Sequence, residues 1–412
     1  MVEINPNRLM HHLQTLRQFG AKDAGVVRPA LSTEDIRARK WLVEQLSSVG
    51  LQTDLDAVGN VFGISPHPGR ALLVGSHSDT QPTGGWLDGA LGVVYALECA
   101  QAFAECSQSR NLPLDVVSWQ DEEGRFLGCL GSRSFVGLLD DEDLNSITSK
   151  DGVLLRHAQK EAGLQHKSRR TFKSLSRDYG GFFEAHIEQG PTLFDEGASI
   201  GVVDHIVALR SLIITFDGQQ NHAGTTMMHR RRDASMGLYR FADQINRRFP
   251  EFAGERTVWT MGRALITPNA ASIIPGHASL ELQFRDPNEA VLETLEKEAH
   301  TIAQEINEWL PIVVNVMRAR PPIAPVAMST SMQDAVREAG EKHAPGHVKT
   351  MPSGAFHDAS ILAQVMPSAM MFIPSIDGIS HDFAENSRDE DIILGCRVFC
   401  DAAETLLLQW NR

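Results

Sequence analysis

Short apolar segments that end in polar residues alternate with helical patterns in the first half of the chain. Residues 71–79 and 114–124 have the pattern of buried strands, and residues 89–105 between them repeat apolar positions at helical spacing. Residues 1–20 and 34–50 also have the spacing of amphipathic helices, and residues 51–64 form a strand-like stretch. This rhythm predicts an α/β sandwich with a largely parallel sheet, in which the chemistry gathers at the carboxyl ends of the strands.

The pattern changes after residue 203. From there to residue 320 the chain reads as strand, helix, strand, strand, helix and strand, the order of a small split β-α-β module. A proline-rich segment follows, and after it the chain resumes the strand and helix pattern of the first half. A length of 412 residues suits two or three domains. We therefore predict a main α/β domain of residues 1–211 and 328–412, interrupted by a smaller α+β domain of residues 212–327.

Composition narrows the classes of partner. The net charge of -14 argues against nucleic-acid binding, because such proteins present basic faces. The N-terminal segment lacks the apolar region of a signal peptide, and no apolar run reaches the about 18 residues of a membrane span. The chain has only five cysteines, as in proteins of reducing compartments. We expect a cytoplasmic protein with neither a membrane nor a nucleic-acid partner.

Polar clusters in turn-like settings beside apolar strands carry the candidate chemistry. They occupy residues 75–79, 84–89, 121–124, 186–190 and 380–382. Each cluster alone has an ordinary structural interpretation, such as a turn residue for Asp88 or a solvated face for paired glutamates. Together their imidazoles and carboxylates form the mixed nitrogen and oxygen ligand set that suits zinc, manganese or a similar divalent ion.

The ordered motifs HSD, GGWLDGALGV, DEEG, HIEQGP and GISH resemble those of the M20-type metallopeptidase clan. HIEQGP, NHAGTT with RRDA, and SGAFHDAS narrow the resemblance to the amidase/hydantoinase/carbamoylase branch. That branch includes N-carbamoyl-L-amino-acid hydrolases, β-ureidopropionases and allantoate amidohydrolases. The resemblance implies an α/β/α catalytic domain like that of metal-dependent aminopeptidases, with an inserted lid or dimerisation domain. It also implies two divalent metal ions and a homodimer.

The same resemblance assigns roles around the metal pair. The ligands it implies are His77, Asp88, Glu123, His186 and His381. Asp88 would bridge the two ions, and Asp79 would orient His77. Glu122 would be the general base toward a water that the two ions acidify. The alternatives are a structural carboxylate at Glu122 and a strand-end cap at Asp79.

The resemblance also implies residues that contact the substrate. They are Gln189, Asn269, Ser272, Arg285, Gly354 and His357. Arg285 would hold a substrate carboxylate, since a guanidinium suits bidentate carboxylate recognition. His222 would reach across a dimer interface and stabilise the oxyanion of a tetrahedral intermediate. The alternatives are an ion pair from Arg285 to Asp286 and a buried structural histidine at His222.

Three positions depart from the pattern of the family. Ser272 stands where the family usually has asparagine, Phe356 stands where it has glycine, and Trp86 is bulky beside the metal cluster. These departures leave the exact substrate open.

We therefore expect a hydrolase that cleaves the C–N bond of an N-carbamoyl amino acid or a similar small carboxylate substrate, with zinc, manganese, cobalt or nickel. The alternative of the same class is hydrolysis of an N-acyl amino acid or dipeptide. A non-catalytic scaffold on the same fold would lack a ligand or Glu122, and all of these residues are present. A serine hydrolase is disfavoured, because no GxSxG motif lies in a strand–turn–helix setting.

Overall fold

The computed structural model describes residues 2–411, so Met1 and Arg412, which the predicted domain limits include, lie outside the described residues. The chain divides into two compact units. One holds the chain up to Asp204 and from Ala327 onward, and the other holds His205–Val326. The predicted limit at residue 211 falls inside β9 (Ala208–Asp217), which pairs along its whole length with β13 (His277–Asp286). Because that sheet belongs to the second unit, the limit lies before β9.

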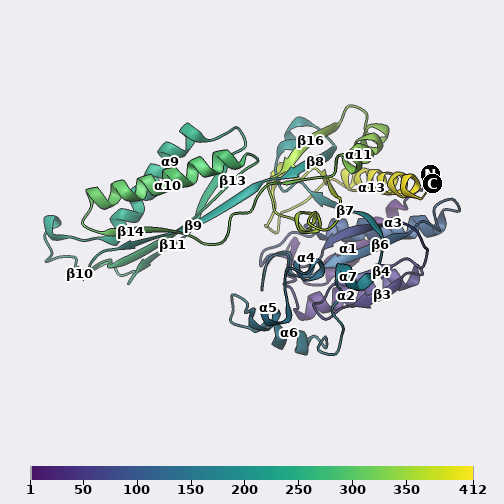
Figure 1. The fold of residues 1–412 in the computed structure, drawn as a ribbon, viewed down its shortest axis with the longest axis horizontal. Coiled ribbons are helices and arrows are strands. Elements are labelled where there is room, and N and C mark those ends of the chain that lie inside the picture. Colours follow the sequence, from purple (N-terminus) through teal and green to yellow (C-terminus); the bar gives the residue numbers. More distant parts are fainter. Residues whose placement is uncertain (1, 412) are drawn as a thin grey trace. The chain divides into compact units, whose positions relative to one another are not determined.

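A nine-stranded mixed sheet forms the centre of the first unit, in the order β15-β8-β17-β7-β5-β6-β4-β3 with β16 paired to β8 (Figure 1). Its strands are β3 (Gln52–Leu55), β4 (Val61–Ile64), β5 (Ala71–His77), β6 (Leu114–Trp119), β7 (Tyr179–Ile187), β8 (Ile200–Ile206), β15 (Val326–Ala327), β16 (Val348–Ser353) and β17 (Ser368–Ile373). β5 is parallel to β6 and β7, and β17 is parallel to β7. The carboxyl ends of these four strands therefore meet at one edge of the sheet.

The strand-like stretch at residues 51–64 is a hairpin rather than one strand. β3 and β4 pair antiparallel, and the Asp56 carboxylate between them accepts hydrogen bonds from the backbone N–H groups of Val58, Gly59 and Asn60, each at 2.9 Å. An aspartate that satisfies three backbone donors fixes a turn that apolar patterning alone does not reveal.

Helices cover the sheet of the first unit. They are α1 (Pro6–Gln18), α2 (Thr33–Ser48), α3 (Ala90–Glu105), α4 (Leu130–Val136), α5 (Asp141–Ser146), α6 (Leu155–Glu161), α7 (Phe172–Leu175), α8 (Thr192–Glu196), α11 (Thr330–His343), α12 (Asp358–Leu362) and α13 (Asp389–Trp410), with the 3-10 turn η2 (Ile376–Gly378) and the small pair β1 (Ala21–Lys22) and β2 (Gly25–Val26). α3 is almost entirely buried because it packs between β5 and β6 on one side and α1 and α13 on the other. α4 contacts β6, while α12 contacts β7 and β17. No helix within residues 2–411 combines the length and the apolar character that a membrane crossing needs.

The second unit has the predicted β-α-β-β-α-β order. Its elements are β9, β10 (Asn221–His222), η1 (Met228–Arg230), α9 (Ala234–Phe252), β11 (Val258–Thr267), β12 (Ile273–Ile274), β13, α10 (Glu289–Trp309) and β14 (Val313–Arg318). The main sheet has the order β11-β13-β9-β14 and is antiparallel throughout. α9 and α10 lie along the same face of this sheet (Figure 1), and Phe216, Phe241, Phe249 and Phe284 are part of the apolar core beneath them. β10 and β12 form a separate small pair.

Candidate metal centre and active site

The strand ends of the first unit bring the predicted ligands together. His77 is the last residue of β5, His186 is the penultimate residue of β7, and Glu123 follows the end of β6. Asp88 comes from the loop before α3, and His381 from the loop after η2. These residues form two groups able to hold a metal ion, namely His77, Asp88 and His186, and Asp88, Glu123 and His381. Within each group the ligand atoms lie within 4.8 Å of one another, and Asp88 belongs to both groups.

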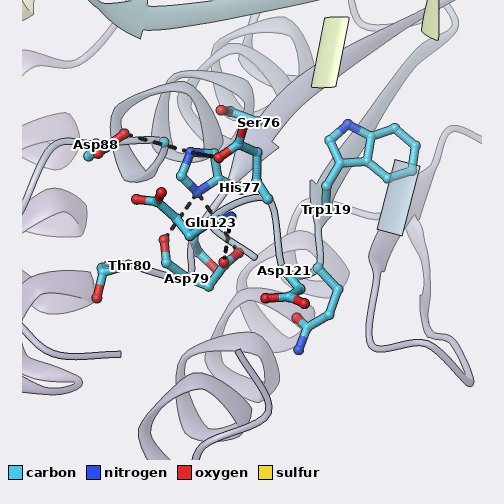
Figure 2. A network of polar contacts seen from close by, with 12 residues as sticks. Ser76, His77, Asp79, Thr80, Asp88, Trp119, Asp121 and Glu123 are labelled. Carbon is cyan, nitrogen blue, oxygen red and sulfur yellow. Dashed lines mark hydrogen bonds and ion pairs between the residues drawn. The ribbon is translucent and has the colours of Figure 1, made fainter. Parts of the chain in front are cut away.

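The two carboxylate oxygens of Asp88 face different histidines. Oδ1 lies 3.7 Å from Nε2 of His77 and 3.2 Å from Nε2 of His186, while Oδ2 lies 3.3 Å from Nε2 of His381. Figure 2 shows Asp88, His77, Glu123 and Asp79 converging on one another. The side chains of His77, His186 and Asp88 are buried, whereas His381 is half exposed. A carboxylate that divides its oxygens in this way has the geometry of a bridging ligand.

Gly89 allows Asp88 to approach the histidines closely. Its φ is +64°, and a Cβ added there would lie 2.4 Å from the His77 imidazole. Its backbone N–H donates to Nε2 of His186 at 3.1 Å. A side chain at this position would both strain the backbone and displace a predicted ligand, so the glycine is required by the site.

The outer nitrogens of the two buried histidines contact backbone carbonyl groups. Nδ1 of His77 lies 3.1 Å from the carbonyl oxygen of Asp79, and Nδ1 of His186 lies 2.9 Å from that of Ile187. Both contacts turn Nε2 toward Asp88. The Asp79 carboxylate is 3.8 Å from His77; one of its oxygens accepts from the backbone N–H of Glu123 at 3.2 Å. The structure thus holds the His77 ring by the main chain of Asp79, while the carboxylate holds the Glu123 backbone.

The site contains more acidic side chains than its own positively charged side chains can neutralise. Burial, and then the neighbouring carboxylates, raise the pKa of Glu122 and of Glu123 well above the usual range. Burial raises the pKa of Asp79 to about 6 and lowers the pKa of His77 to about 4. Among residues 2–411, the buried oxygens Oδ1 of Asp79 and Oε1 of Glu123 have no hydrogen-bond partner. The site therefore combines a neutral imidazole with carboxylates, two of which have a buried oxygen without a hydrogen-bond donor. Such a set of ligand atoms fits divalent cations.

Glu122 lies beside the ligands without belonging to either group. Its Oε2 is 3.7 Å from Nε2 of His77, and its Oε1 is 3.7 Å from the Cys129 sulfur. The preceding Asp121 has a φ of +57° and accepts hydrogen bonds from the backbone of residues 125–127 at 2.7–2.9 Å. A fixed loop therefore carries both glutamates, and the turn at Asp121 lets the two adjacent side chains reach different sides of the centre.

Two residues that the sequence analysis did not single out support the ligands. The buried Glu385 accepts from the backbone N–H of Leu87 at 3.3 Å and of Asp88 at 3.0 Å, and from the Ser380 hydroxyl at 2.7 Å. Gln81 donates to Oε2 of Glu123 at 2.6 Å. Both lie within four residues of a predicted functional residue, and that proximity is the only sequence signal that points to them.

The predicted substrate residues of the first unit lie in different environments. Gln189 has a φ of +59° and donates to Oδ2 of Asp88 at 3.2 Å. His357 is buried, with its ring centroid 4.7 Å from that of His186 and its Nε2 2.9 Å from the Ser353 hydroxyl. Gly354 is exposed. Gln189 and His357 therefore directly adjoin predicted metal ligands.

Two of the departures from the family pattern also lie in the first unit. The buried Trp86 donates from Nε1 to Asn386 at 3.2 Å, and the Arg17 guanidinium lies 5.1 Å from its ring centroid. Phe356 is half-buried and precedes His357. The bulk of Trp86 is thus accommodated by contacts within the unit, while Phe356 is adjacent to a residue that packs on a ligand.

The remaining predicted residues belong to the second unit. His222, Asn269 and Ser272 are exposed. His222 pairs with Ile273 in the β10–β12 ladder, and the Ser272 carbonyl accepts from the Ala223 N–H at 3.0 Å. His222 is thus not the buried structural histidine of the alternative interpretation, and Ser272 directly precedes the strand that pairs with it.

Arg285 is a half-buried residue on β13. It donates to the Gln283 side chain at 3.0 Å, and burial and then the nearby Arg320 lower its pKa. Asp286 is buried and accepts from the backbone N–H of Asn288 at 2.6 Å and from Thr257. Because neighbouring side chains on a strand point to opposite faces, Asp286 lies on the other face of the sheet from Arg285.

Comparison with known proteins identifies the family. Residues 73–405 match the model of Peptidase family M20/M25/M40.

The chain belongs to the M20 peptidase family.

Relatives within this family match almost the whole chain. It is 34% identical over 396 residues to an N-carbamoyl-L-amino-acid amidohydrolase of Paenarthrobacter aurescens, covering 95% of each protein. It is 32% identical over 405 residues to an allantoate amidohydrolase of Bacillus subtilis (strain 168), covering 96% of each. A crystal structure of an amidase of the hydantoinase/carbamoylase family from Burkholderia phymatum has a TM-score of 0.89 at 44% identity and covers 100% of both chains. The M20 family and the mixed α/β fold predicted from the sequence are therefore confirmed.

Proposed function

We propose that this M20 protein is an amidohydrolase that cleaves the C–N bond of an N-carbamoyl amino acid or a closely related ureido acid. The observation that carries this proposal is the match, over 95% or more of each chain, to an N-carbamoyl-L-amino-acid amidohydrolase and an allantoate amidohydrolase. Both relatives are amidohydrolases whose named substrates are small carboxylates. Water adds to the carbamoyl carbon, and the bond from this carbon to the amino nitrogen breaks. The products are the amine and carbamic acid, which decomposes to carbon dioxide and ammonia.

Two divalent ions would occupy the two ligand groups, with Asp88 shared between them. The nitrogen and oxygen donors suit zinc, manganese, cobalt or nickel. When bound, such a pair supplies Lewis acidity and lowers the pKa of water. The support for two ions is the division of the Asp88 oxygens between His77 and His186 on one side and His381 on the other.

Glu122 is the proposed general base. Its Oε2 lies 3.7 Å from Nε2 of His77, on the side of the predicted ligands. Burial raises the pKa of Glu122 well above its usual range, which suits a carboxylate that takes a proton from water and delivers it to the leaving nitrogen.

His222 is the proposed oxyanion donor. Its Nδ1 accepts from the backbone N–H groups of Gly224 at 3.0 Å and Thr225 at 3.2 Å. An imidazole nitrogen that accepts hydrogen bonds carries no proton, so the neutral ring has its proton on Nε2. The local backbone thereby prepares the outer nitrogen to donate to a developing negative charge.

Arg285 is the proposed partner of the substrate carboxylate. Its guanidinium is half-buried on β13, and a guanidinium suits bidentate recognition of a small carboxylate. Gln189, Asn269, Ser272, Gly354 and His357 complete the proposed contacts with the substrate.

A substrate screen with defined metals tests the proposed function. The protein, stripped by a chelator and reloaded with zinc, manganese, cobalt or nickel, is assayed with N-carbamoyl, ureido, N-formyl and N-acetyl derivatives of the same amino acids. We expect amine release from carbamoyl or ureido compounds only after reloading. Activity on acyl compounds or dipeptides but not on carbamoyl compounds would contradict the proposal, and full activity in excess chelator would contradict the metal pair.

We also propose a homodimer formed through the second unit. β11 and β14 are the two edge strands of its main sheet and expose Val258, Leu265, Val313 and Met317. Edge strands with exposed apolar side chains are prone to pair with another chain. Sedimentation analysis of the active enzyme is expected to give a dimer, and an active monomer would contradict the proposal that His222 reaches the partner's site.

The cellular location follows from the cysteines. All five are free thiols. Free thiols, most of them buried, are typical of a reducing compartment, so we infer a cytoplasmic location.

A further inference from the structure

Cys129 has a backbone conformation that favours glycine. Its φ is +57° and its ψ is +36°, in the left-handed region, at the N-cap position of α4. In this conformation the Cβ of a residue with a side chain lies too close to the following carbonyl oxygen, so the conformation is strained relative to the right-handed one. Strain of this kind persists where the surrounding structure holds the residue in place, and it is concentrated at functional sites. The local contacts of Cys129 therefore need an explanation.

Both the main chain and the side chain of Cys129 contact Glu122. The Cys129 N–H donates to the Glu122 carbonyl at 3.1 Å, and the sulfur lies within hydrogen-bond reach of Oε1 of Glu122 at 3.7 Å. The cysteine side chain is fully buried. The loop of residues 123–128 between them thus closes on the residue that we propose as the general base.

The thiol remains a proton donor in this environment. Burial, and then the charge of Glu122, raise the pKa of Cys129 well above its usual range. A protonated thiol has one hydrogen to donate. The Asp358 carboxyl is the other acceptor near the thiol. Burial and then the charge of Glu184 raise the pKa of Asp358, whereas hydrogen bonds from Ser132 and Cys129 lower it. Ser132 donates to Oδ1 of Asp358 at 2.5 Å, so Asp358 has a donor besides Cys129. The contact of the Cys129 sulfur with Oε1 of Glu122 at 3.7 Å is the one that reaches the proposed base.

The two oxygens of Glu122 have separate environments. Oε1 faces the Cys129 thiol, and Oε2 faces Nε2 of His77. A carboxylate can rotate about its last bond and exchange its oxygens, because this torsion is broad. A donor on one oxygen removes that freedom and leaves the other oxygen directed at the predicted ligands.

We propose that Cys129 is a positioning residue whose S–H group holds Oε1 of Glu122 and so directs Oε2 toward the reacting water. The inference rests on the proposed role of Glu122. It goes beyond that role because it assigns to a buried cysteine, away from both ligand groups, control over the alignment of the base.

The first test separates alignment of the base from packing. Cys129→Ala removes the donor, Cys129→Ser keeps a donor, and Cys99→Ala is the control, a buried cysteine in α3. We expect Cys129→Ala to lower kcat roughly 3–10-fold, the range for one lost hydrogen bond, with unchanged KM and metal content. Cys129→Ser should recover most of the loss, and Cys99→Ala should keep the wild-type kcat.

A double-mutant cycle with Glu122→Gln decides whether the effect acts through the base. We expect Cys129→Ala to cause no further loss in the Glu122→Gln background. An equal loss in both backgrounds, or an unchanged kcat in Cys129→Ala, overturns the inference. Near-normal turnover of Glu122→Gln itself would instead overturn the proposed role of Glu122, and the inference with it.

An infrared measurement gives a readout that does not depend on activity or on a stable Cys129→Ala variant. The S–H stretching band of Cys129 is assigned by its loss in Cys129→Ser or Cys129→Ala. We expect this band to shift in Glu122→Gln, which changes the acceptor, and to stay in place in Glu105→Gln, a change of an exposed side chain. A band with the same position in wild type and Glu122→Gln overturns the inference.

Discussion

The metal centre of the first unit and the predicted recognition residues of the second unit are built in opposite ways. His77 and His186 are buried at strand ends, where backbone groups fix their orientation, and Asp88 is buried in the loop before α3. His222 is exposed on a two-residue ladder apart from the main sheet, and the exposed Ser272 directly precedes the partner strand of that ladder. This difference indicates that side chains which bind cations need rigid support, because their ligand atoms must all lie at a defined distance from the ion. Groups that contact a transient ligand can remain in solvent until it binds.

Backbone conformation reveals a feature that both regions share. Asp121, Gln189 and His381 in the first unit and Asn269 in the second all have positive φ without being glycine. Each is a predicted site residue or the neighbour of one. Both regions therefore have local backbone strain at positions that direct a polar group, and of these four residues only Asp121 is buried.

The largest effect is expected from the proposed base. Glu122→Gln removes the group that accepts the proton but keeps the shape of the side chain, so kcat should fall about 10²–10⁴-fold. The content of bound metal should stay at the wild-type level, because Glu122 belongs to neither ligand group. Steady-state kinetics and metal analysis check both statements, with Glu105→Gln as the control. Near-normal turnover of the loaded variant would show that the buried region does not supply the base.

The next effect tests whether the exposed region takes part in chemistry. His222→Ala removes the proposed oxyanion donor, so kcat should fall about 10²–10³-fold. The melting temperature should not change, since the ring is exposed. His229→Ala, a change at another exposed histidine of the same unit, is the matched control. If both variants keep full kcat, the second unit has no catalytic contribution.

A smaller effect on binding is expected from Arg285. Arg285→Ala should raise KM for carboxylate substrates roughly 10–100-fold, the range for one charge-assisted contact, and change kcat much less. Arg263→Ala on β11, an exposed arginine of the same sheet, should leave KM unchanged. A substrate whose carboxylate is replaced by an amide should show little difference between wild type and Arg285→Ala. Equal KM values for the carboxylate substrate would remove Arg285 from the binding site.

The smallest effect concerns the rigidity of the buried region alone. Gly50 and Gly89 both have positive φ, but a Cβ at Gly50 meets nothing within 4 Å, whereas one at Gly89 meets the His77 ring. Gly50→Ala should therefore cost about 1 kcal/mol of unfolding free energy, and Gly89→Ala roughly 1–3 kcal/mol more. Urea denaturation of the metal-free proteins measures both. Equal losses of unfolding free energy in the two variants would mean that the His77 ring moves to accommodate the added methyl group.

The sequence was sufficient to predict the fold class. Alternating strand and helix patterns indicated the α/β class, and the ordered motifs contain the candidate ligands that the structure brings together around Asp88. These predictions were within reach because a strand end is visible as an apolar run that stops at a polar residue. The strands β3 and β4 were merged into one stretch, because the turn depends on backbone hydrogen bonds to Asp56 that have no periodic signature.

The contacts that support the site could not be predicted from the sequence. Glu385 accepts a hydrogen bond from the Asp88 backbone although the two residues are 297 positions apart in the sequence. Arg39 lies 3.7 Å from Asp79, which is 40 positions further along the chain. Such contacts depend on tertiary packing, so no local pattern marks them. The role of Cys129 was hidden for the same reason, since a lone cysteine after a polar loop has no distinctive spacing.

The first residues of α12 connect specificity to rate. His357 packs on the imidazole of His186, and the adjacent Asp358 receives the Ser132 hydroxyl beside the thiol of Cys129. Phe356, where the family has glycine, directly precedes this pair. Anyone who redesigns Phe356 to admit a different substrate will therefore also shift a short helix that supports both the ligand side and the base side of the centre. Selectivity gained at that position will be accompanied by altered turnover, unless a second change restores the packing of α12.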